Sequence, residues 1–497
     1  MHNELIHKVM KRKSWLIVGI LGVVIFGLGM LANSIMQRKA ESMHLSKANN
    51  NIKDFESRNE IWGDSYPREY ESWAKTADTT FRSKHMSSNA DDLLEERPEM
   101  VILWAGYAFA KDYKAPRGHF YSVKDVVGTL RTGAPDANHP DVQPGTCWTC
   151  KSPDVPRMMN QMGVENFYKA KWSQLGSDVV NPIGCADCHD PKTMNLTITR
   201  PALVEAYQRM GKDIKKATHQ EMRSLVCAQC HVEYYFKGDN KYLTFPWDKG
   251  MSLENMEEYY DNAKHVDFVH KLSKAPILKA QHPDFEVYNL GIHAQRGVSC
   301  ADCHMPYKSE GGVKYTDHHI SSPLANINNT CQVCHRESET TLAQNVYERQ
   351  DMVYQLRNRL EKQLAKVHLM AKFLWDNNAT EQEMKPVLDL IRKSQWRWDF
   401  ITASHGAAFH APLESQRILG DGLYLAVQAE AKMNDISNKK NISGKFVMPD
   451  VSTKAKAQKF IGLDIPKESS AKAQFMKTVV PEWLKKAKAK GVLVKDK

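Results

Sequence analysis

Cys185-Ala186-Asp187-Cys188-His189 is one of four stretches in this 497-residue chain that follow the pattern Cys-x-x-Cys-His. The pattern is the attachment site of c-type haem: the two thiols bond to the porphyrin edge and the histidine binds the iron. All ten cysteines fall into five Cys-x-x-Cys pairs. The sequence therefore predicts five covalently bound haems. The motif residues are Cys147, Cys150, Lys151, Cys185, Cys188, His189, Cys227, Cys230, His231, Cys300, Cys303, His304, Cys331, Cys334 and His335.

Disulfides and zinc sites are the other uses of paired cysteines. Five pairs do not group evenly into Cys₄ zinc sites. Neither zinc nor five disulfides would explain why histidine follows four of the pairs. Haem attachment accounts for both observations.

The first motif, Cys147-Trp148-Thr149-Cys150-Lys151, has lysine where histidine is expected. A degenerate or empty motif is the alternative, but both cysteines are present. Only a neutral amine can bind iron, and the ordinary lysine pKa is about 10.4, so burial and ferric iron must remove the proton. Axial ligands are a main determinant of haem chemistry. We expect four haems to carry electrons and the lysine haem to react at an open sixth position.

The N-terminus has the layout of an export signal. Four cations, at positions 8 and 11–13, precede an uncharged run over residues 15–32. The run is just long enough to span a bilayer. Residues 1–36 are predicted to be a signal peptide or an N-terminal membrane anchor, and residues 37–497 a periplasmic pentahaem domain.

The composition is that of a globular protein, with 42% hydrophobic and 25% charged residues. The net charge of +10 could indicate nucleic-acid binding. The cations are scattered, however, and five haems would bring ten propionates that need counter-charges. We expect no nucleic-acid partner.

The organisation predicts a mainly α fold. Loops and short helices should wrap the haems over about residues 110–340, where strand-like alternation is scarce. Long helices are expected over about 340–435: one from Leu342 to Leu374, one that begins at a Thr380–Glu383 capping box, and one through Ile418 and Ala431. Residues 436–497 form a C-terminal tail.

The lysine motif, followed by four Cys-x-x-Cys-His motifs, resembles the pentahaem cytochrome c nitrite reductases that form ammonia. Further blocks over roughly residues 60–485 resemble the same family. They are residues 116–120 (Pro-Arg-Gly-His-Phe), 129–133 (Thr-Leu-Arg-Thr-Gly), 231–236 (His-Val-Glu-Tyr-Tyr-Phe), 278–283 (Leu-Lys-Ala-Gln-His-Pro), 315–318 (Tyr-Thr-Asp-His) and 395–399 (Gln-Trp-Arg-Trp-Asp).

The resemblance implies the second axial ligands, which the sequence alone cannot select among 16 further histidines. It pairs His318 with His189, His119 with His231, His410 with His304, and His293 with His335. His319 and His405 are close alternatives to His318 and His410. The remaining histidines are expected at surface or loop positions.

The resemblance also implies a catalytic group, made of Lys151, Arg131, Tyr234 and His282. It implies a calcium site beside this group, with side-chain oxygens from Glu233 and Gln281 and carbonyl oxygens from Tyr234 and Lys279. Such hard oxygen ligands suit calcium.

The activity implied is the reduction of nitrite to ammonium by a homodimer packed through the long helices. The electron donor would be a membrane-bound multihaem quinol dehydrogenase or a soluble multihaem cytochrome. Two alternatives stay open: a multihaem enzyme of hydroxylamine, sulfite or tetrathionate, and a non-catalytic electron conduit. The lysine motif disfavours a conduit, which needs no open iron.

Overall fold

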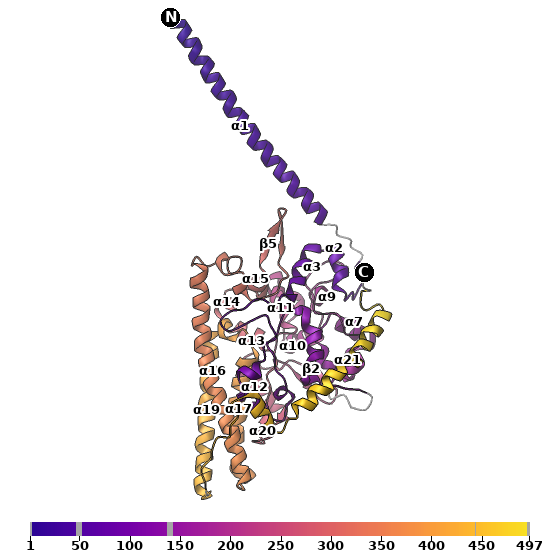
Figure 1. The fold of residues 1–497 in the computed structure, drawn as a ribbon, viewed down its shortest axis with the longest axis vertical. Coiled ribbons are helices and arrows are strands. Elements are labelled where there is room, and N and C mark those ends of the chain that lie inside the picture. The colour runs from indigo at the N-terminus through magenta and orange to yellow at the C-terminus, as the bar shows by residue number, and fades with distance from the viewer. Residues whose placement is uncertain (1, 46–51, 137–142, 443, 495–497) are drawn as a thin grey trace.

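The N-terminal segment is one long helix, α1 (His2–Leu45), that projects away from the rest of the molecule (Figure 1). The structure is a computed structural model that describes residues 2–45, 52–136, 143–442 and 444–494. Within α1, residues Trp15–Lys39 have a mean hydropathy of 2.5, and none of this apolar stretch is buried in the protein. By length and composition it could cross a membrane. The helix also continues past residue 36, where we expected the N-terminal segment to end.

The region around the haem motifs is built from short helices, because Pro, Gly and the motifs themselves interrupt it. They are α2 (Asn59–Ser65), α3 (Pro67–Ala74), α4 (Leu93–Glu96), α5 (Glu99–Leu103), α6 (Ser122–Gly128), α7 (Asp154–Met162), α8 (Val164–Lys169), α9 (Cys185–Cys188), α10 (Pro201–Arg209), α11 (His219–Ala228), α12 (Leu253–Asn262), α13 (Asp284–Asn289), α14 (Ile292–Gln295) and α15 (Cys300–His304).

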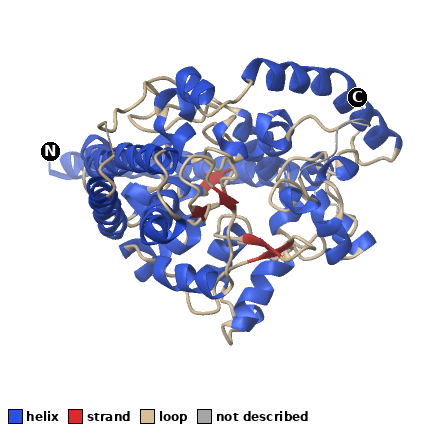
Figure 2. Ribbon diagram, turned by 90° about the horizontal axis from the view of Figure 1, so that it is seen from below, coloured by secondary structure: helices blue, strands red, loops and turns tan. Residues whose placement is uncertain are grey.

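The strands of the described chain form three antiparallel pairs, which lie among helices and loops (Figure 2). They are β1 (Tyr235–Lys237) with β2 (Tyr242–Thr244), β3 (Phe268–Val269) with β4 (Pro276–Ile277), and β5 (Tyr307–Glu310) with β6 (Val313–Thr316). The mainly α prediction is confirmed.

Three long helices lie side by side after the last motif: α16 (Glu339–Asp376), α17 (Glu381–Ala403) and α19 (Pro412–Lys439) (Figure 1). The predicted capping box is present, because Thr380 Oγ1 accepts from Glu383 N at 3.3 Å and Glu383 Oε2 accepts from Thr380 N at 2.7 Å. Gly422 lets α19 approach both neighbours, since a Cβ there would lie 2.8 Å from Leu360 and 3.2 Å from Arg397. The three predicted long helices are confirmed.

The chain ends in helices α20 (Lys454–Phe460) and α21 (Ile465–Ala489), which follow the short α18 (Ala407–His410) and α19. Helix α21 packs over the first haem motif. Trp148, between the two motif cysteines, stacks on Trp172 at 5.0 Å, and Trp172 contacts Phe475 and Trp483 of α21 at 6.1 and 5.5 Å between ring centroids. The predicted C-terminal tail therefore covers the lysine motif.

Candidate functional site

Each Cys-x-x-Cys pair lies on or beside a single helical turn. The second and fourth motifs form α9 and α15, the third ends α11, and 3₁₀ turns carry the first (Gly145–Trp148) and the fifth (Cys331–Val333). Residues three apart on a turn share a face, so both thiols of a motif point the same way. None of the ten cysteines, all of which lie in the described part of the chain, forms a disulfide. This arrangement fits attachment of two thiols to one edge of a porphyrin.

The four motif histidines each face a second imidazole at nearly the same distance. Ring centroids are 6.1 Å apart for His189 and His318, 6.3 Å for His231 and His119, 6.2 Å for His304 and His410, and 6.3 Å for His335 and His293. Metal–imidazole bonds are about 2.0 Å long, and the centroid lies about 1.1 Å beyond the nitrogen, so an iron between two imidazoles requires about 6.2 Å. The four pairs fit a haem iron in each gap.

This distance alone does not define a ligand pair. His282 also lies 6.3 Å from His231 and 6.4 Å from His405. The first pair is not a ligand pair, because His231 already faces His119. The second pair contains no motif histidine. The sequence left His319 open as an alternative to His318, and His405 as an alternative to His410. In the structure His318 and His410 lie opposite the motif histidines, and His405 lies beside His282.

The free ring nitrogens of the paired histidines are held in different ways. Nδ1 of His189 is bonded to the carbonyl of Met194 at 2.8 Å, and Nδ1 of His304 to the carbonyl of Ser321 at 2.9 Å. His318 is held by the carbonyl of Thr316 at 2.8 Å. Nδ1 of His231 instead lies 3.5 Å from the carboxylate of Asp284. A donor bond from Nδ1 leaves Nε2 free to bind the iron.

The lysine motif is fixed on both sides of Lys151 by a buried arginine. Arg200 donates to the carbonyls of Thr149 at 2.9 Å and Ser152 at 2.8 Å, and it pairs with Asp187 of the second motif at 2.5 Å. Ser122 Oγ donates to the carbonyl of Lys151 at 2.8 Å. These bonds fix the backbone that carries the lysine.

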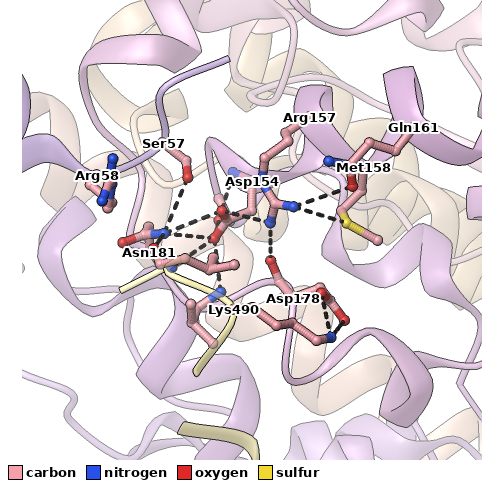
Figure 3. A network of polar contacts seen from close by, with 12 residues as sticks. Ser57, Arg58, Asp154, Arg157, Met158, Gln161, Asp178, Asn181 and Lys490 are labelled. Atoms are coloured by element: carbon pink, nitrogen blue, oxygen red, sulfur yellow. Dashed lines mark hydrogen bonds and ion pairs between the residues drawn. The ribbon is translucent and has the colours of Figure 1, made fainter. Parts of the chain in front are cut away.

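A second network holds the chain that leaves the lysine motif (Figure 3). Asp154, at the start of α7, accepts from Arg157 at 3.0 Å and from the side chain of Asn181 at 3.0 and 3.2 Å. The Asn181 amide also donates to the carbonyl of Val492, and Lys490 pairs with Asp178 at 2.7 Å. The end of the chain is thereby joined to the segment after Lys151.

Arg131 lies on a short turn that is tied to the first motif. Asp112 accepts from Thr129 Oγ1 at 2.9 Å and from Leu130 N at 3.1 Å, and Lys472 of α21 donates to Thr132 at 3.2 Å. Gln143 bridges the motif, because it donates to the carbonyl of Arg131 at 3.3 Å and accepts from the Cys147 thiol at 3.3 Å. Gln143 therefore ties the backbone of Arg131 to the lysine motif, while the guanidinium lies over the rings of Phe109 and Tyr113, at 4.4 and 5.7 Å from their centroids.

Tyr234 and His282 complete the cluster beside the lysine motif. Burial, followed by the proximity of the Cys150 and Cys147 thiols, raises the pKa of Tyr234 well above its ordinary value, so its hydroxyl stays a donor. Burial, followed by the charge of Lys151, lowers the pKa of His282 well below its ordinary value. The structure thus places Tyr234 and His282 close to the lysine motif, to which Gln143 also ties the backbone of Arg131.

The predicted calcium residues lie together on the other side of Tyr234. Glu233 is 1% exposed; its carboxylate accepts from Tyr260 at 2.8 Å and from Gln281 N at 2.7 Å. Gln281 donates its side-chain amide to the carbonyl of Lys279 at 3.1 Å, and a half-turn of that amide would present its oxygen instead.

No lysine or arginine pairs with Glu233 within the part of the chain that the structure describes, and burial raises its pKa well above the ordinary value. A buried carboxylate without a counter-cation fits a cation site. The described residues hold no cluster of three His, Cys, Asp or Glu side chains that could bind a metal ion. Backbone carbonyls would therefore have to supply several of the ligands.

The expectation that the remaining histidines lie on the surface or in loops is wrong for His368, which is buried within α16, whereas His270 lies in a loop after β3. His270 and His368 are buried and stack at 3.8 Å between ring centroids. His270 is bonded to the carbonyl of Ile102 at 2.7 Å, and His368 to Gln395 Oε1 at 2.6 Å. The position of His368 within the apolar stripe of the first long helix was the signal that could have predicted its burial.

Comparisons with known proteins agree with this site. The model of the cytochrome c552 family matches residues 58–492. Cytochrome c-552 of Parabacteroides distasonis is 61% identical over 490 residues, covering 98% of this chain and 99% of that protein. The protein of the same name from Bacteroides thetaiotaomicron is 61% identical over 487 residues, covering 98% and 99%.

A solved structure is also similar: cytochrome c nitrite reductase from Desulfovibrio desulfuricans, described with two calcium sites in its catalytic subunit. Its TM-score is 0.74 at 28% identity, covering 84% of this chain and 91% of that chain. With five haem motifs in the described fold and a family model that spans nearly all of it, the chain belongs to the cytochrome c552 family.

Proposed function

We propose that this chain is a cytochrome c nitrite reductase, which converts nitrite to ammonium outside the cytoplasm. The balanced reaction takes up six electrons and eight protons per nitrite and releases two water molecules. One observation carries the proposal: each of the four histidine motifs faces a second imidazole, whereas Tyr234 and His282 lie close to the lysine motif and Gln143 ties the backbone of Arg131 to it. An enzyme needs one open iron, and an electron conduit needs none.

Five haem c groups would be held by the ten cysteines, by Lys151 and by the four histidine pairs. The haem iron at Lys151 would supply an electron-donating site with one open position. Lys151 serves as a ligand only as the neutral amine, and the carbonyl bonds of Arg200 and Ser122 keep its backbone in one place. The four histidine pairs hold the haems that bring electrons to it.

The three side chains on the open face have distinct tasks. Arg131 presents a fixed positive charge, which attracts the nitrite anion and stabilises negative charge as N–O bonds break. His282 is a neutral imidazole at rest, so it can take a proton on one nitrogen and release one from the other. Tyr234 keeps its proton and donates a hydrogen bond to the bound anion.

Calcium would be held by Glu233, the carbonyls of Tyr234 and Lys279, and the side chain of Gln281. Two of these residues adjoin Tyr234 and His282 in sequence. The ion would therefore fix the positions of the groups that contact nitrite, as outer-shell groups do at other metal sites. Chelation should lower turnover without releasing haem, because thioether bonds hold the haems. Full activity of a calcium-free protein would contradict this role.

A homodimer is the proposed assembly, packed through the long helices. Exposed apolar residues lie on their outer faces: Met352 on α16, and Leu413, Tyr424 and Val427 on α19. A membrane anchor is the proposed role of α1, since its stretch Trp15–Lys39 is long and apolar enough to cross a membrane and none of it is buried in the protein. The donor would then be a membrane-bound multihaem quinol dehydrogenase rather than a soluble multihaem cytochrome.

An anaerobic assay tests the function. Purified holoprotein with nitrite and reduced viologen should form ammonium. Arg131→Gln should lower kcat/KM by a factor on the order of 10²–10³, the usual effect of removing one preorganised group from an active site. Arg209→Gln is a matched control, because Arg209 pairs with Asp248 away from the motifs. Electron paramagnetic resonance should show one high-spin ferric haem that nitrite perturbs; only low-spin signals, together with no ammonium, would overturn the proposal.

A further inference from the structure

His231 differs from the other motif histidines in the group that faces its Nδ1. In the second and fourth motifs this partner is a neutral carbonyl, at 2.8 Å from His189 and 2.9 Å from His304. In the fifth motif a carboxylate, Glu337, lies 3.9 Å from His335, but both side chains are about half exposed. The Asp284 carboxylate lies 3.5 Å from Nδ1 of His231, whose side chain is also half exposed, but Asp284 itself is only 17% exposed, against 50% for Glu337.

Asp284 is held in place for this contact. Its Oδ1 accepts from Ser404 Oγ at 2.9 Å, its own N–H donates to the carbonyl of His282 at 2.6 Å, and Phe285 N donates to the carbonyl of His231 at 3.0 Å. No lysine or arginine ion pair to Asp284 is present among the described residues. Its negative charge is therefore directed at the His231 ring.

The third motif is also the junction between the other motifs. The Cys230 and Cys150 thiols are close enough to shift each other's pKa, which places the third motif beside the lysine motif. The Cys227 and Cys300 thiols also shift each other's pKa, which places the third motif beside the fourth motif. An electron that comes from the fourth motif therefore passes the His231 haem before it reaches the lysine haem.

We propose that Asp284 is a positioning residue that lowers the reduction potential of the haem held by His231 and His119, an inference that rests on the haem ligation of the proposed function. A carboxylate that accepts the Nδ1–H bond makes the imidazole a stronger electron donor, which favours the ferric iron. One electron then leaves this haem, which becomes ferric, and enters the lysine haem, which becomes ferrous. A lower potential at the His231 haem increases the driving force of this last transfer.

Redox titration of the holoprotein, followed by optical and paramagnetic-resonance spectra without nitrite, tests this directly. Asp284→Asn keeps the size and an acceptor oxygen but removes the charge. We expect one of the four low-spin haems to shift to a higher midpoint potential, with the other three unchanged. Glu337→Gln is the matched control, and its solvent-exposed pair should leave all midpoints unchanged.

Ser404→Ala tests the sign of the shift in midpoint potential, and this test does not depend on the folding of Asp284→Asn. Without the Ser404 hydrogen bond, the Asp284 carboxylate concentrates more charge on His231, so the same haem should shift to a lower midpoint potential. Opposite shifts in the two variants support the proposal. An unmoved midpoint in Asp284→Asn with five haems attached, or an upward shift in Ser404→Ala, would overturn it. Neither result depends on nitrite turnover, so failure of the proposed function is detected separately.

Discussion

The second and fourth haem motifs have the same sequence, Cys-Ala-Asp-Cys-His, in different surroundings. In both, the aspartate caps its own helical turn: Asp187 accepts from Gly184 N at 2.8 Å, and Asp302 from Ser299 N at 2.7 Å. Each also pairs with an arginine from outside the motif. The Asp187–Arg200 pair is buried, with 4% and 0% of the side chains exposed, whereas Asp302 of the Asp302–Arg223 pair is 31% exposed.

The difference shows that a motif fixes its local turn but not the energetics of its charges. Arg200 also donates to the carbonyls of Thr149 and Ser152, so it joins the second motif to the lysine motif. Arg223 lies over the Tyr307 ring at 5.0 Å, near the surface hairpin. One pair therefore belongs to the active centre, and the other joins two carrier motifs.

The largest effect is expected from Asp187→Ala. It leaves the Arg200 guanidinium buried without its counter-charge, which costs about 3–5 kcal/mol when one partner of a buried pair is removed. Denaturant unfolding of the holoprotein measures the change. A loss below about 1 kcal/mol would mean that the carbonyl bonds of Arg200 suffice without the carboxylate.

Arg200→Lys should affect turnover more than haem content. Lysine keeps the charge but cannot reach two carbonyls and a carboxylate together. The lysine motif should then shift, and displacements of this kind lower kcat by roughly 10- to 100-fold. Arg223→Lys is the matched control and should leave kcat unchanged. Equal losses in both variants would show that the second motif has no special connection to the active centre.

A smaller effect is expected from Asp302→Ala. Partly exposed ion pairs contribute about 0–1 kcal/mol, and the Asp302 cap adds roughly 1 kcal/mol. The free energy of unfolding should fall by about 1–2 kcal/mol, which is less than for Asp187→Ala. The same denaturant titration, run side by side, gives the comparison; a larger loss for Asp302→Ala would reverse it.

The smallest effect is expected in how the stability contributed by the Asp302 carboxylate depends on pH. Burial acts to raise the pKa of Asp302, but the hydrogen bonds from Ser299 and Gln220 and the charge of Arg223 lower it overall. A carboxylate with a lowered folded pKa stabilises the protein above its unfolded pKa of about 3.9. The free energy of unfolding that Asp302→Asn loses relative to the parent should therefore be largest near pH 6 and should decrease as pH falls below about 4. A difference that grows on acidification would have the wrong sign.

Most of the fold could be predicted because its signals are local. The haem motifs, the Thr380 capping box and the apolar stripe of α16 each depend on residues within a few turns. The helix-bound motif aspartates were not predicted to form ion pairs, since Arg200 and Arg223 lie outside the motifs and carry no pattern of their own. The burial of His368 could have been predicted from the apolar stripe of α16, but its stack on His270 depends on a contact between distant parts of the chain.

The partners of the motif histidines illustrate the limit at the site. His318 follows His189 by well over a hundred residues, and His119 precedes His231, so no spacing rule joins them. Only the resemblance supplied these pairs, and the same is true of Arg131, Tyr234 and His282. Asp284 could not be singled out at all, because its role depends on a contact between two side chains rather than on a pattern.

Helix α21 has a consequence for the order in which the protein matures. A chain exported from its N-terminus presents residues 465–489 after all five motifs, yet Phe475 and Trp483 cover Trp172, which stacks on Trp148 between the two cysteines of the lysine motif. We expect haem to be attached at Cys147 and Cys150 before α21 packs, because that packing fixes Trp172 and, through it, Trp148 between the two cysteines. A chain that stopped before residue 465 would lack Phe475 and Trp483 and would leave Trp172 without this cover.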